Sequence, residues 1–118
     1  MSEESVAYQK AFSFAKRIVN LYRHLTGNHR EFVLSKQILR SGTSIGANIA
    51  EARCGSSRKD FAAKIYIALK ECSETLYWLE LLHETGYLSD EEFASLYKDC
   101  ESIRRILSAT TKNTLKSE

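Results

Sequence analysis

The sequence predicts an all-α protein, an antiparallel up-down-up-down left-handed four-helix bundle that forms one domain over residues 1–118. Two observations support this fold class. The 118 residues include no proline and only five glycines, so little interrupts a helix. Apolar residues recur every three or four positions in four long segments, which short polar stretches separate. Because these connections are short, consecutive helices are expected to pack antiparallel.

The first helix is expected over residues 3–25. Its core face repeats through Ala7, Ala11, Phe14, Ile18, Leu21 and Leu25. Phe12 and Val19 widen the apolar arc beyond what one bundle core needs, which makes them candidates for a contact between subunits. The sequence Thr26-Gly27-Asn28 predicts the end of this helix, with Gly27 in the left-handed conformation that closes many helices.

Four bases of the first helix are expected on the face opposite the core and are the best candidates for contact with nucleic acid. They are Lys10, Lys16, Arg17 and Arg23. The net charge is only +2, but residues 5–50 contain seven Lys or Arg and one acid, whereas residues 71–103 contain nine acids and one base. Two interpretations stay open: the basic half packs against the acidic half, within or between subunits, or it attracts phosphate groups.

The second helix is expected over residues 30–53 and contains an unusual stretch, RSGTSIGANIAEA, at residues 40–52. A glycine inside a helix costs about 1 kcal/mol relative to alanine, so Gly42 and Gly46 predict the close approach of a neighbouring helix. A polar stripe follows the flank of this helix at Arg40, Ser44, Asn48 and Glu51. The stripe is either a hydrogen-bonded network that fixes helix register or a binding or catalytic cluster.

The third helix is expected over residues 58–85, and Ser57 with Asp60 resembles a capping box at its start. This helix carries apolar residues on more than one side, which predicts burial on more than one side. The candidates for a subunit interface on its second side are Ile67, Trp78 and Leu81.

Antiparallel packing of the second and third helices sets Arg40 opposite Glu71, with Glu74 one turn away, and predicts an ion pair between them. Neighbouring carboxylates also occur in general acid-base sites and divalent-metal sites. The nearby arginine favours an ion pair instead, and the one Glu-x-x-His sequence, Glu80 to His83, has no match on another helix. No metal, cofactor or small-molecule substrate is expected.

The fourth helix is expected over residues 90–109. Gly86-Tyr87-Leu88 ends the third helix, and Ser89 with Glu92 forms a capping box at the start of the fourth. Its core face repeats through Phe93, Leu96, Cys100, Ile103 and Leu107. Residues 110–118 are polar and are expected to form a mobile tail.

Cysteine and hydropathy patterns exclude several protein classes. Cys54, Cys72 and Cys100 are widely spaced and form no C-x-x-C pair, so neither a disulfide framework nor a zinc site is indicated. Free thiols suit a reducing cytoplasm. The N-terminal residues lack an apolar signal core, and no apolar run approaches the roughly 20 residues that span a membrane. A cytoplasmic protein without a membrane segment is therefore expected.

The stretch at residues 40–52 resembles the R-x-x-x-S-I-x-A-N-I-A-E-G signature of a bacterial four-helix-bundle family. Members are encoded in intervening sequences of 23S ribosomal RNA genes and are also labelled S23 ribosomal proteins. Ala52 stands where the family most often has glycine. Further matches are Asp60-Phe61, Ile67-Ala68 with Glu71, Glu74-Thr75, the run from Tyr77 to Leu82, and Gly86-Tyr87-Leu88.

This resemblance implies an up-down-up-down bundle, homopentameric assembly and no established enzymatic activity. The chain is also distantly similar to the accessory protein of diversity-generating retroelements, a basic pentamer that binds RNA. Both similarities concern the whole bundle, and neither implies a cofactor or a catalytic residue.

Three functional hypotheses follow. The first is a non-catalytic homo-oligomer that associates with RNA or other nucleic acid through the basic face of the first helix, although no run of exposed aromatic residues predicts base stacking. The second is a protein-binding adaptor or scaffold, whose binding depends little on salt. The third is an enzyme, which requires a polar cluster that converges on an open pocket. That cluster would comprise Arg40, Asn48, Glu51, Glu71 and Glu74.

Overall fold

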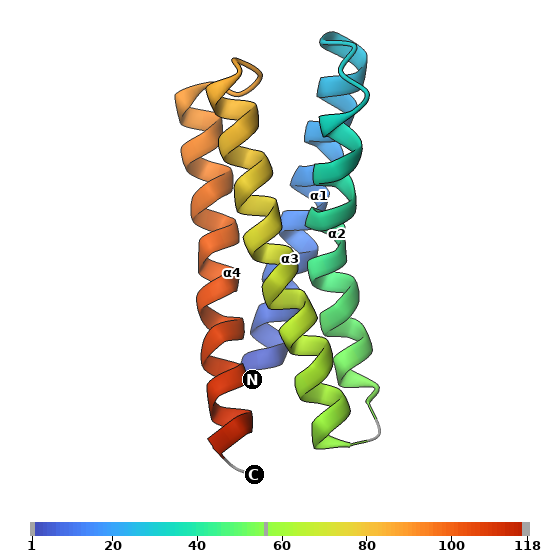
Figure 1. Ribbon diagram of the computed structural model, residues 1–118, viewed down its shortest axis with the longest axis vertical. Coiled ribbons are helices and arrows are strands. Elements are labelled where there is room, and N and C mark those ends of the chain that lie inside the picture. The colour runs from blue at the N-terminus through green and yellow to red at the C-terminus, as the bar shows by residue number, and fades with distance from the viewer. Residues whose placement is uncertain (1, 56, 117–118) are drawn as a thin grey trace.

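The computed structural model describes residues 2–55 and 57–116, which form four α-helices. These are α1 (Glu3–Asn28), α2 (Leu34–Arg53), α3 (Arg58–Glu84) and α4 (Asp90–Lys116). Figure 1 shows successive helices running in alternating directions, with the two ends of the chain at the same end of the bundle. The predicted all-α class and four-helix bundle are confirmed. The left-handed turn of the bundle stays a prediction.

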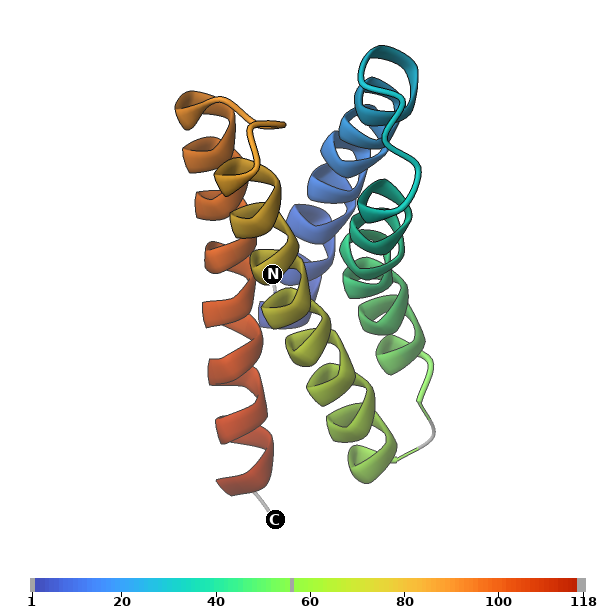
Figure 2. The same ribbon diagram turned by 45° about the horizontal axis from the view of Figure 1, so that its top comes forward.

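All four helices contribute to one apolar core. Each helix packs against two others, in the pairs α1–α2, α2–α3, α3–α4 and α1–α4. Figure 2 shows the helices tilted against one another and the connections confined to the two ends of the bundle. The largest fully buried apolar side chains are Phe14, Ile18, Leu25, Ile38, Ile45, Ile49, Ile65, Leu79, Leu82, Ile103 and Leu107. This arrangement leaves one flank of each helix open to solvent, and those flanks are where the candidate sites lie.

The two glycines of α2 face α1, as the sequence predicts, but they differ in how tightly they pack. A Cβ atom added at Gly42 would lie 2.9 Å from the Cγ1 and Cγ2 atoms of Ile18, which is fully buried. A Cβ atom added at Gly46 would lie 3.5 Å from the Cβ atom of Ala11, which is an ordinary contact. Gly42 is therefore required by the α1–α2 packing, and Gly46 is not.

The connection between α1 and α2 differs from the prediction. α1 continues through Gly27 to Asn28, so the expected left-handed Gly27 is wrong; the positive φ angle, 54°, falls on Arg30 instead. The ring of His29 lies 5.4 Å from that of Tyr87, which follows α3, and 4.9 Å from that of His24. The edge-on contact with Tyr87 links the end of α1 to a residue far away in the sequence, whereas His24 lies only five residues before His29.

α2 begins at Leu34 rather than at residue 30, because Glu31 caps it. The Glu31 carboxylate accepts hydrogen bonds from the backbone N–H groups of Val33 (3.2 Å), Leu34 (3.1 Å) and Ser35 (2.7 Å). Burial alone would raise the pKa of Glu31, but the bonds from Ser35, Leu34 and Val33 outweigh it and lower this pKa below its ordinary value. A side chain placed before the helix therefore sets its first residue.

The predicted caps of α3 and α4 are confirmed. The Ser57 hydroxyl accepts the Asp60 N–H at 3.1 Å. At the start of α4, the Ser89 hydroxyl accepts the Glu92 N–H and the Glu92 carboxylate accepts the Ser89 N–H, both at 3.1 Å. Gly86, between these helices, has a φ of 88°, a left-handed conformation in which glycine is favoured.

α4 continues to Lys116, so the prediction that the helix ends at residue 109 and a mobile tail follows is wrong for residues 110–116. Residues 117 and 118 lie outside the described part of the chain. The hydroxyl groups of Thr111 and Thr114 donate to backbone carbonyls one turn earlier, at 2.9 Å and 2.8 Å. Thr110 does the same and is buried. Since these threonines satisfy their hydroxyls inside the helix, they do not end it.

Candidate functional site

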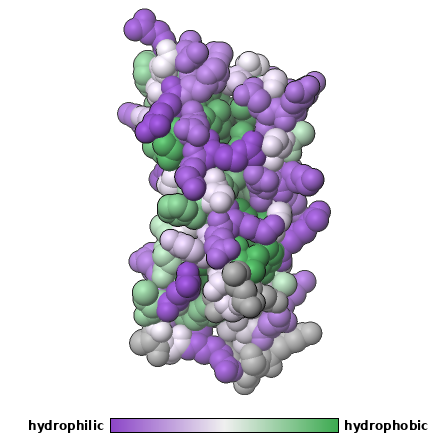
Figure 3. Space-filling model, turned by 180° about the vertical axis from the view of Figure 1, so that it is seen from behind, coloured by the Kyte–Doolittle hydropathy of each residue, from purple (hydrophilic) through white to green (hydrophobic). Residues whose placement is uncertain are grey.

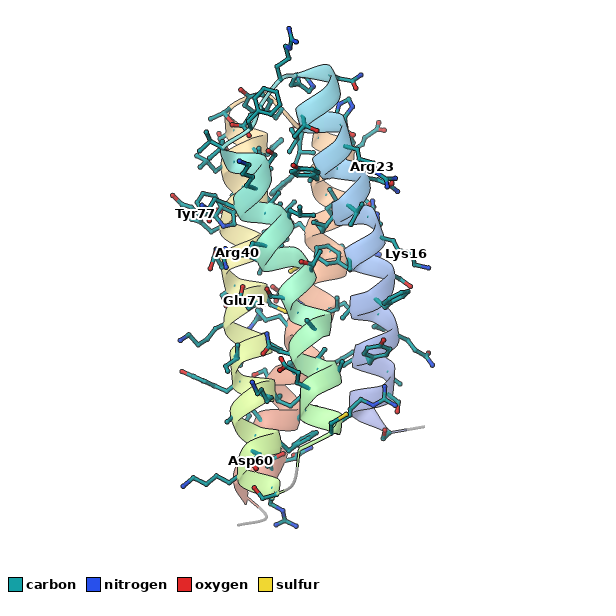
Figure 4. The ribbon with its side chains drawn as sticks, turned by 90° about the vertical axis from the view of Figure 1, so that its right-hand side faces the viewer. Lys16, Arg23, Arg40, Asp60, Glu71 and Tyr77 are labelled. Carbon is teal, nitrogen blue, oxygen red and sulfur yellow. The ribbon has the colours of Figure 1, made fainter. Side chains whose placement is uncertain are left out.

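The predicted ion pair between α2 and α3 is confirmed. The Arg40 guanidinium lies between Glu71 and Glu74, as Figure 4 shows for Arg40 and Glu71. Its Nη1 atom lies 3.5 Å from Oε2 of Glu71, and its Nη2 atom donates to Oε2 of Glu74. Nη2 also donates to Gln37 at 3.2 Å, and the Trp78 indole donates to Glu74 at 2.9 Å. Arg40 and Glu74 therefore have their main partners within the chain.

The remaining polar residues of α2 are also engaged. The Ser44 hydroxyl donates to the Arg40 carbonyl at 2.6 Å, and the Asn48 amide donates to the Ser44 carbonyl at 2.9 Å. Glu51 forms an ion pair with Lys64 of α3 at 3.7 Å. These contacts match the interpretation of the stripe as a structural network, because each one stays within α2 or joins it to α3.

Sequence analysis missed one buried polar contact between α2 and α3, in the interface that we call the α2–α3 seam. The hydroxyls of Ser41 on α2 and Thr75 on α3 are fully buried and share a hydrogen bond of 2.9 Å. Thr75 also donates to the Glu71 carbonyl at 2.8 Å. The signal was present in the sequence, because Ser41 falls on the apolar face of α2, where an unpaired hydroxyl is costly.

Glu71 is the least satisfied group of the α2–α3 seam. Its side chain is 19% exposed, and its Oε2 atom has no hydrogen-bond partner among the described residues. Burial raises the pKa of Glu71, the charge of Glu74 raises it further, and Arg40 and Lys70 oppose this rise. A carboxyl group with a raised pKa can act as an acid or base, but such chemistry also needs a pocket at which a substrate reaches it.

A groove lies on the other side of α3, against α4, and has a volume of about 780 Å³. The His83 ring stacks on Phe93 with 4.2 Å between ring centres, and its Nε2 atom lies 2.7 Å from the Asp90 carboxylate. The Tyr97 hydroxyl lies 3.4 Å from Glu80. This groove does not include Arg40, so it does not bring the predicted polar cluster to an open pocket.

The four bases predicted as one face of α1 divide into two pairs. Lys10 donates to the Ser102 hydroxyl at 3.2 Å, and Arg17 forms an ion pair with Asp99 at 2.6 Å, so both lie in the seam between α1 and α4. Residues seven apart lie on nearly the same side of a helix. Lys10 and Arg17 therefore share the α4 side, and the prediction of a single basic face of four residues is wrong.

The other pair, Lys16 and Arg23, lies on the outer side of α1 and is exposed, as Figure 4 shows. Among the side chains that the structure describes, no acid lies within ion-pair distance of either. Arg17 and Arg40 thus fit the interpretation that the basic residues pair with acidic residues of the same chain. Lys16 and Arg23 do not, and their charges are available to a binding partner.

The predicted interface residues lie on two separate helices. On α3, Ile67 is 39% exposed, and Trp78 and Leu81 are half-buried. Two tyrosines that sequence analysis missed extend this surface, with 55% of Tyr66 and 58% of Tyr77 exposed. We call these five residues the α3 strip; Figure 4 shows Tyr77 pointing away from the bundle.

The predicted interface residues on α1 are Phe12, which is exposed, and Val19, which is half-buried. In the described chain α1 packs against α2 and α4 only, so these two residues are not continuous with the α3 strip. Figure 3 shows mainly hydrophilic side chains on the face turned away from the viewer in Figure 1, with hydrophobic patches between them. The apolar side chains on this face therefore gather in patches and do not cover it evenly.

The cysteines and the other metal-ligating residues do not gather into a site in the described part of the chain. Cys72 and Cys100 are buried, and Cys54 is exposed. A hydrogen bond with Cys100, together with burial, raises the pKa of Cys72 well above its usual range. Within residues 2–55 and 57–116, no cluster of three His, Cys, Asp or Glu side chains could hold a metal ion, and no helix could cross a membrane.

The fold and the seam together define a class of four-helix bundles. In this chain an arginine, a serine and an asparagine spaced along the second helix form a polar stripe, and the arginine pairs with carboxylates on the third helix. The chain belongs to the 23S rRNA-intervening sequence protein family, whose model matches residues 3–109.

A solved structure supports this assignment. The chain is similar to a Bacteroides thetaiotaomicron protein described as having unknown function and as belonging to the S23 ribosomal protein family, with 51% sequence identity and a TM-score of 0.92. The similarity covers 94% of this chain and 99% of that chain. No curated protein matches the sequence significantly. The similar structure thus shares the fold and carries no assigned activity.

Proposed function

We propose that this protein is a non-catalytic bundle that assembles with further copies of itself and associates with RNA through the outer side of α1. The observation that carries the proposal is the position of Lys16 and Arg23, which are exposed, lie two turns apart and lack an acidic partner among the described side chains. Cations that are not neutralised within a protein attract phosphate groups. Lys10 and Arg17 belong to the α1–α4 seam and are not part of this surface.

Copies of the chain join through the α3 strip. Its exposed aromatic and aliphatic area is typical of a surface that contacts another protein, and tyrosine and tryptophan are enriched in such contacts. The family resemblance implies five copies. An oligomer repeats Lys16 and Arg23 on every subunit, so that weak individual contacts with one RNA combine into effective binding.

The RNA proposal is tested by binding of the purified oligomer to labelled structured RNA at about 50 mM and about 200 mM salt. Wild-type affinity should fall steeply with salt, and a Lys16→Glu/Arg23→Glu variant should lose most of the binding. A matched control, Lys36→Glu/Lys98→Glu, makes the same change of charge on α2 and α4. The proposal fails if the wild type does not bind at low salt, or if both double variants lose binding equally.

The assembly proposal is tested by measuring mass in solution by light scattering. The wild type should have a multiple of the 13.4 kDa chain mass. A Tyr66→Ser/Tyr77→Ser variant should shift toward the monomer, because both tyrosines are more than half exposed and contribute little to the subunit's own core. A monomeric wild type would contradict the proposal.

The groove between α3 and α4 favours a second candidate function, that of a protein-binding adaptor. The aromatic rings of Phe93 and Tyr97 line this groove together with His83, and such rings are frequent anchors for protein partners. A protein captured through this groove would bind with little dependence on salt, and Phe93→Ala would weaken it. RNA binding, in contrast, would not respond to that variant.

A further inference from the structure

A row of cations and aromatic rings runs across the outer side of α1 and onto the end of α2. The guanidinium carbon of Arg53 lies 5.1 Å from the centre of the Tyr8 ring. The rings of Tyr8 and Phe12 stack with 6.2 Å between centres and an angle of 26° between planes. The Lys16 ammonium lies 5.2 Å from the centre of the Phe12 ring. We call these four residues the cation–aromatic strip.

The strip follows from the helical repeat and from the packing of α1 against α2. Tyr8, Phe12 and Lys16 are four residues apart, so they follow one another along the same side of α1. Arg53 comes from the last turn of α2, which runs antiparallel to α1 and ends beside its first turns. The pattern on α1 is visible in the sequence, but its fourth member becomes visible only in the fold.

Of the two rings of the strip, Phe12 is open to solvent, whereas Tyr8 is partly buried against the core. Phe12 is 53% exposed, although burial of its ring would be favourable, and it lies outside the apolar core. A surface hollow of about 370 Å³ borders the other end of the strip and is lined by Tyr8, Ala50, Arg53 and Cys54. The two rings have a cation at each end, Lys16 beside Phe12 and Arg53 beside Tyr8, and the exposed Phe12 ring together with the hollow provides space for a flat group beside charged ones.

These features match the chemistry of single-stranded nucleic acid. Proteins that bind single strands combine cations along the phosphate backbone with aromatic rings on which unpaired bases stack. A duplex offers its phosphates, but its bases are stacked on one another and cannot reach a ring. A binding surface made only of Lys16 and Arg23 would accept either form, whereas the exposed Phe12 ring adds a contact that only an unpaired base can make.

Building on the RNA association proposed above, we propose that the cation–aromatic strip binds single-stranded RNA. An unpaired base stacks on Phe12, and Lys16 and Arg53 contact the phosphates that flank it. Arg23 lies seven residues beyond Lys16, or about 10 Å along the helix axis, and continues the phosphate contacts in that direction. The ligand class is therefore an unpaired segment of RNA, such as a loop or a free end, rather than a duplex.

The test compares a short unstructured RNA with a duplex of the same sequence, using the intact protein and fluorescence anisotropy at about 50 mM and about 200 mM salt. The single strand should bind more tightly than the duplex. Phe12→Ala should weaken binding of the single strand about fivefold or more, because loss of one stacked base has at least this effect. Phe12→Tyr should retain the binding, since it keeps the ring.

The matched control is Phe32→Ala, which removes a ring of the same exposure, 53%, from the connection between α1 and α2 and should leave single-strand binding unchanged. Equal binding of duplex and single strand, or a Phe12→Ala variant with wild-type affinity, would overturn this inference and leave the proposed RNA association intact. A lack of salt-sensitive binding to either RNA would overturn both. A lower oligomer mass of Phe12→Ala would identify the strip as a contact between copies and would also overturn the inference.

Discussion

Positively charged residues have opposite surroundings in the α2–α3 seam and on the outer side of α1. In the seam, Arg40 lies between two carboxylates, and Trp78 donates to one of them. On α1, Lys16 lies over an aromatic ring and has no acid beside it among the described side chains. The polar side chains of the stretch with the family signature thus have their partners within the chain. The cations without an acidic partner lie instead on α1, a helix of ordinary composition.

Burial explains the difference. The Glu71 carboxylate, only 19% exposed, is largely withdrawn from water and must be paired, so its partner Arg40 cannot be changed without cost. A charge on the outer side of a helix stays hydrated, and its replacement changes what the surface attracts with little effect on folding. The seam should therefore respond to substitution through stability, and the outer side of α1 should respond through binding.

The largest expected effect on stability is that of Arg40→Met. The change leaves Glu71 and Glu74, one turn apart, without the cation that separates their charges. Since Arg40 is 50% exposed, we expect a loss of about 2 kcal/mol rather than the full cost of a buried charge. Urea unfolding at neutral pH measures it. An Arg40→Met/Glu71→Gln/Glu74→Gln variant should regain more than half of the loss, and an unchanged single variant would show that the ion pair contributes nothing.

A smaller effect distinguishes the two glycines of α2. Gly42→Ala should destabilise the protein by about 1 kcal/mol, because overpacking against Ile18 exceeds the gain in helix propensity. Gly46→Ala should leave the stability unchanged or raise it by up to about 1 kcal/mol, since its Cβ has room. Thermal unfolding of the two variants side by side provides the measurement. Equal behaviour of the two would contradict the close contact assigned to Gly42.

The smallest expected effect concerns pH. The folded pKa of Glu71 is raised, so its ionisation destabilises the fold as pH rises from the ordinary carboxyl range through the raised value. Glu71→Gln should therefore gain stability over the wild type at neutral pH and lose this advantage in acid. The folded pKa of Glu31 is lowered, so its contribution is present above the ordinary range and disappears as pH falls through the lowered value. Glu31→Gln should therefore be less stable than the wild type at neutral pH and lose this difference in acid. If the stability difference from the wild type depended on pH in the same way in both variants, the assigned pKa shifts would be refuted.

Local patterns in the sequence were sufficient for most of the fold. The caps at Ser57 and Ser89 each depend on residues within one turn, and the pairing of Arg40 with Glu71 and Glu74 required only a short turn between two helices. Periodicity also identified the core residues of α1 and, except for the partly buried Phe93, those of α4. These features are determined by neighbours in the sequence or by the simplest arrangement of helices.

Some features that escaped prediction are local, such as the Glu31 cap of α2 and the extension of α4, but others depend on contacts between distant residues. His29, which directly follows the extra turn of α1, contacts the distant Tyr87, and the pairing of Arg17 with Asp99 depends on how α4 packs against α1. The cation–aromatic strip needs Arg53 from α2 beside Tyr8 of α1. A helical pattern specifies which residues share one side of a helix, and it does not specify which neighbouring helix that side meets.

The most direct test of the contrast measures RNA affinity and unfolding free energy on two variants, Lys16→Glu/Arg23→Glu and Arg40→Met, at equal concentrations of folded protein. We expect the first to lose salt-sensitive RNA binding and to unfold like the wild type. We expect the second to lose about 2 kcal/mol of stability and to bind RNA like the wild type. An Arg40→Met variant that is folded but no longer binds RNA would contradict this separation of stability from binding. It would make the α2–α3 seam part of the binding surface.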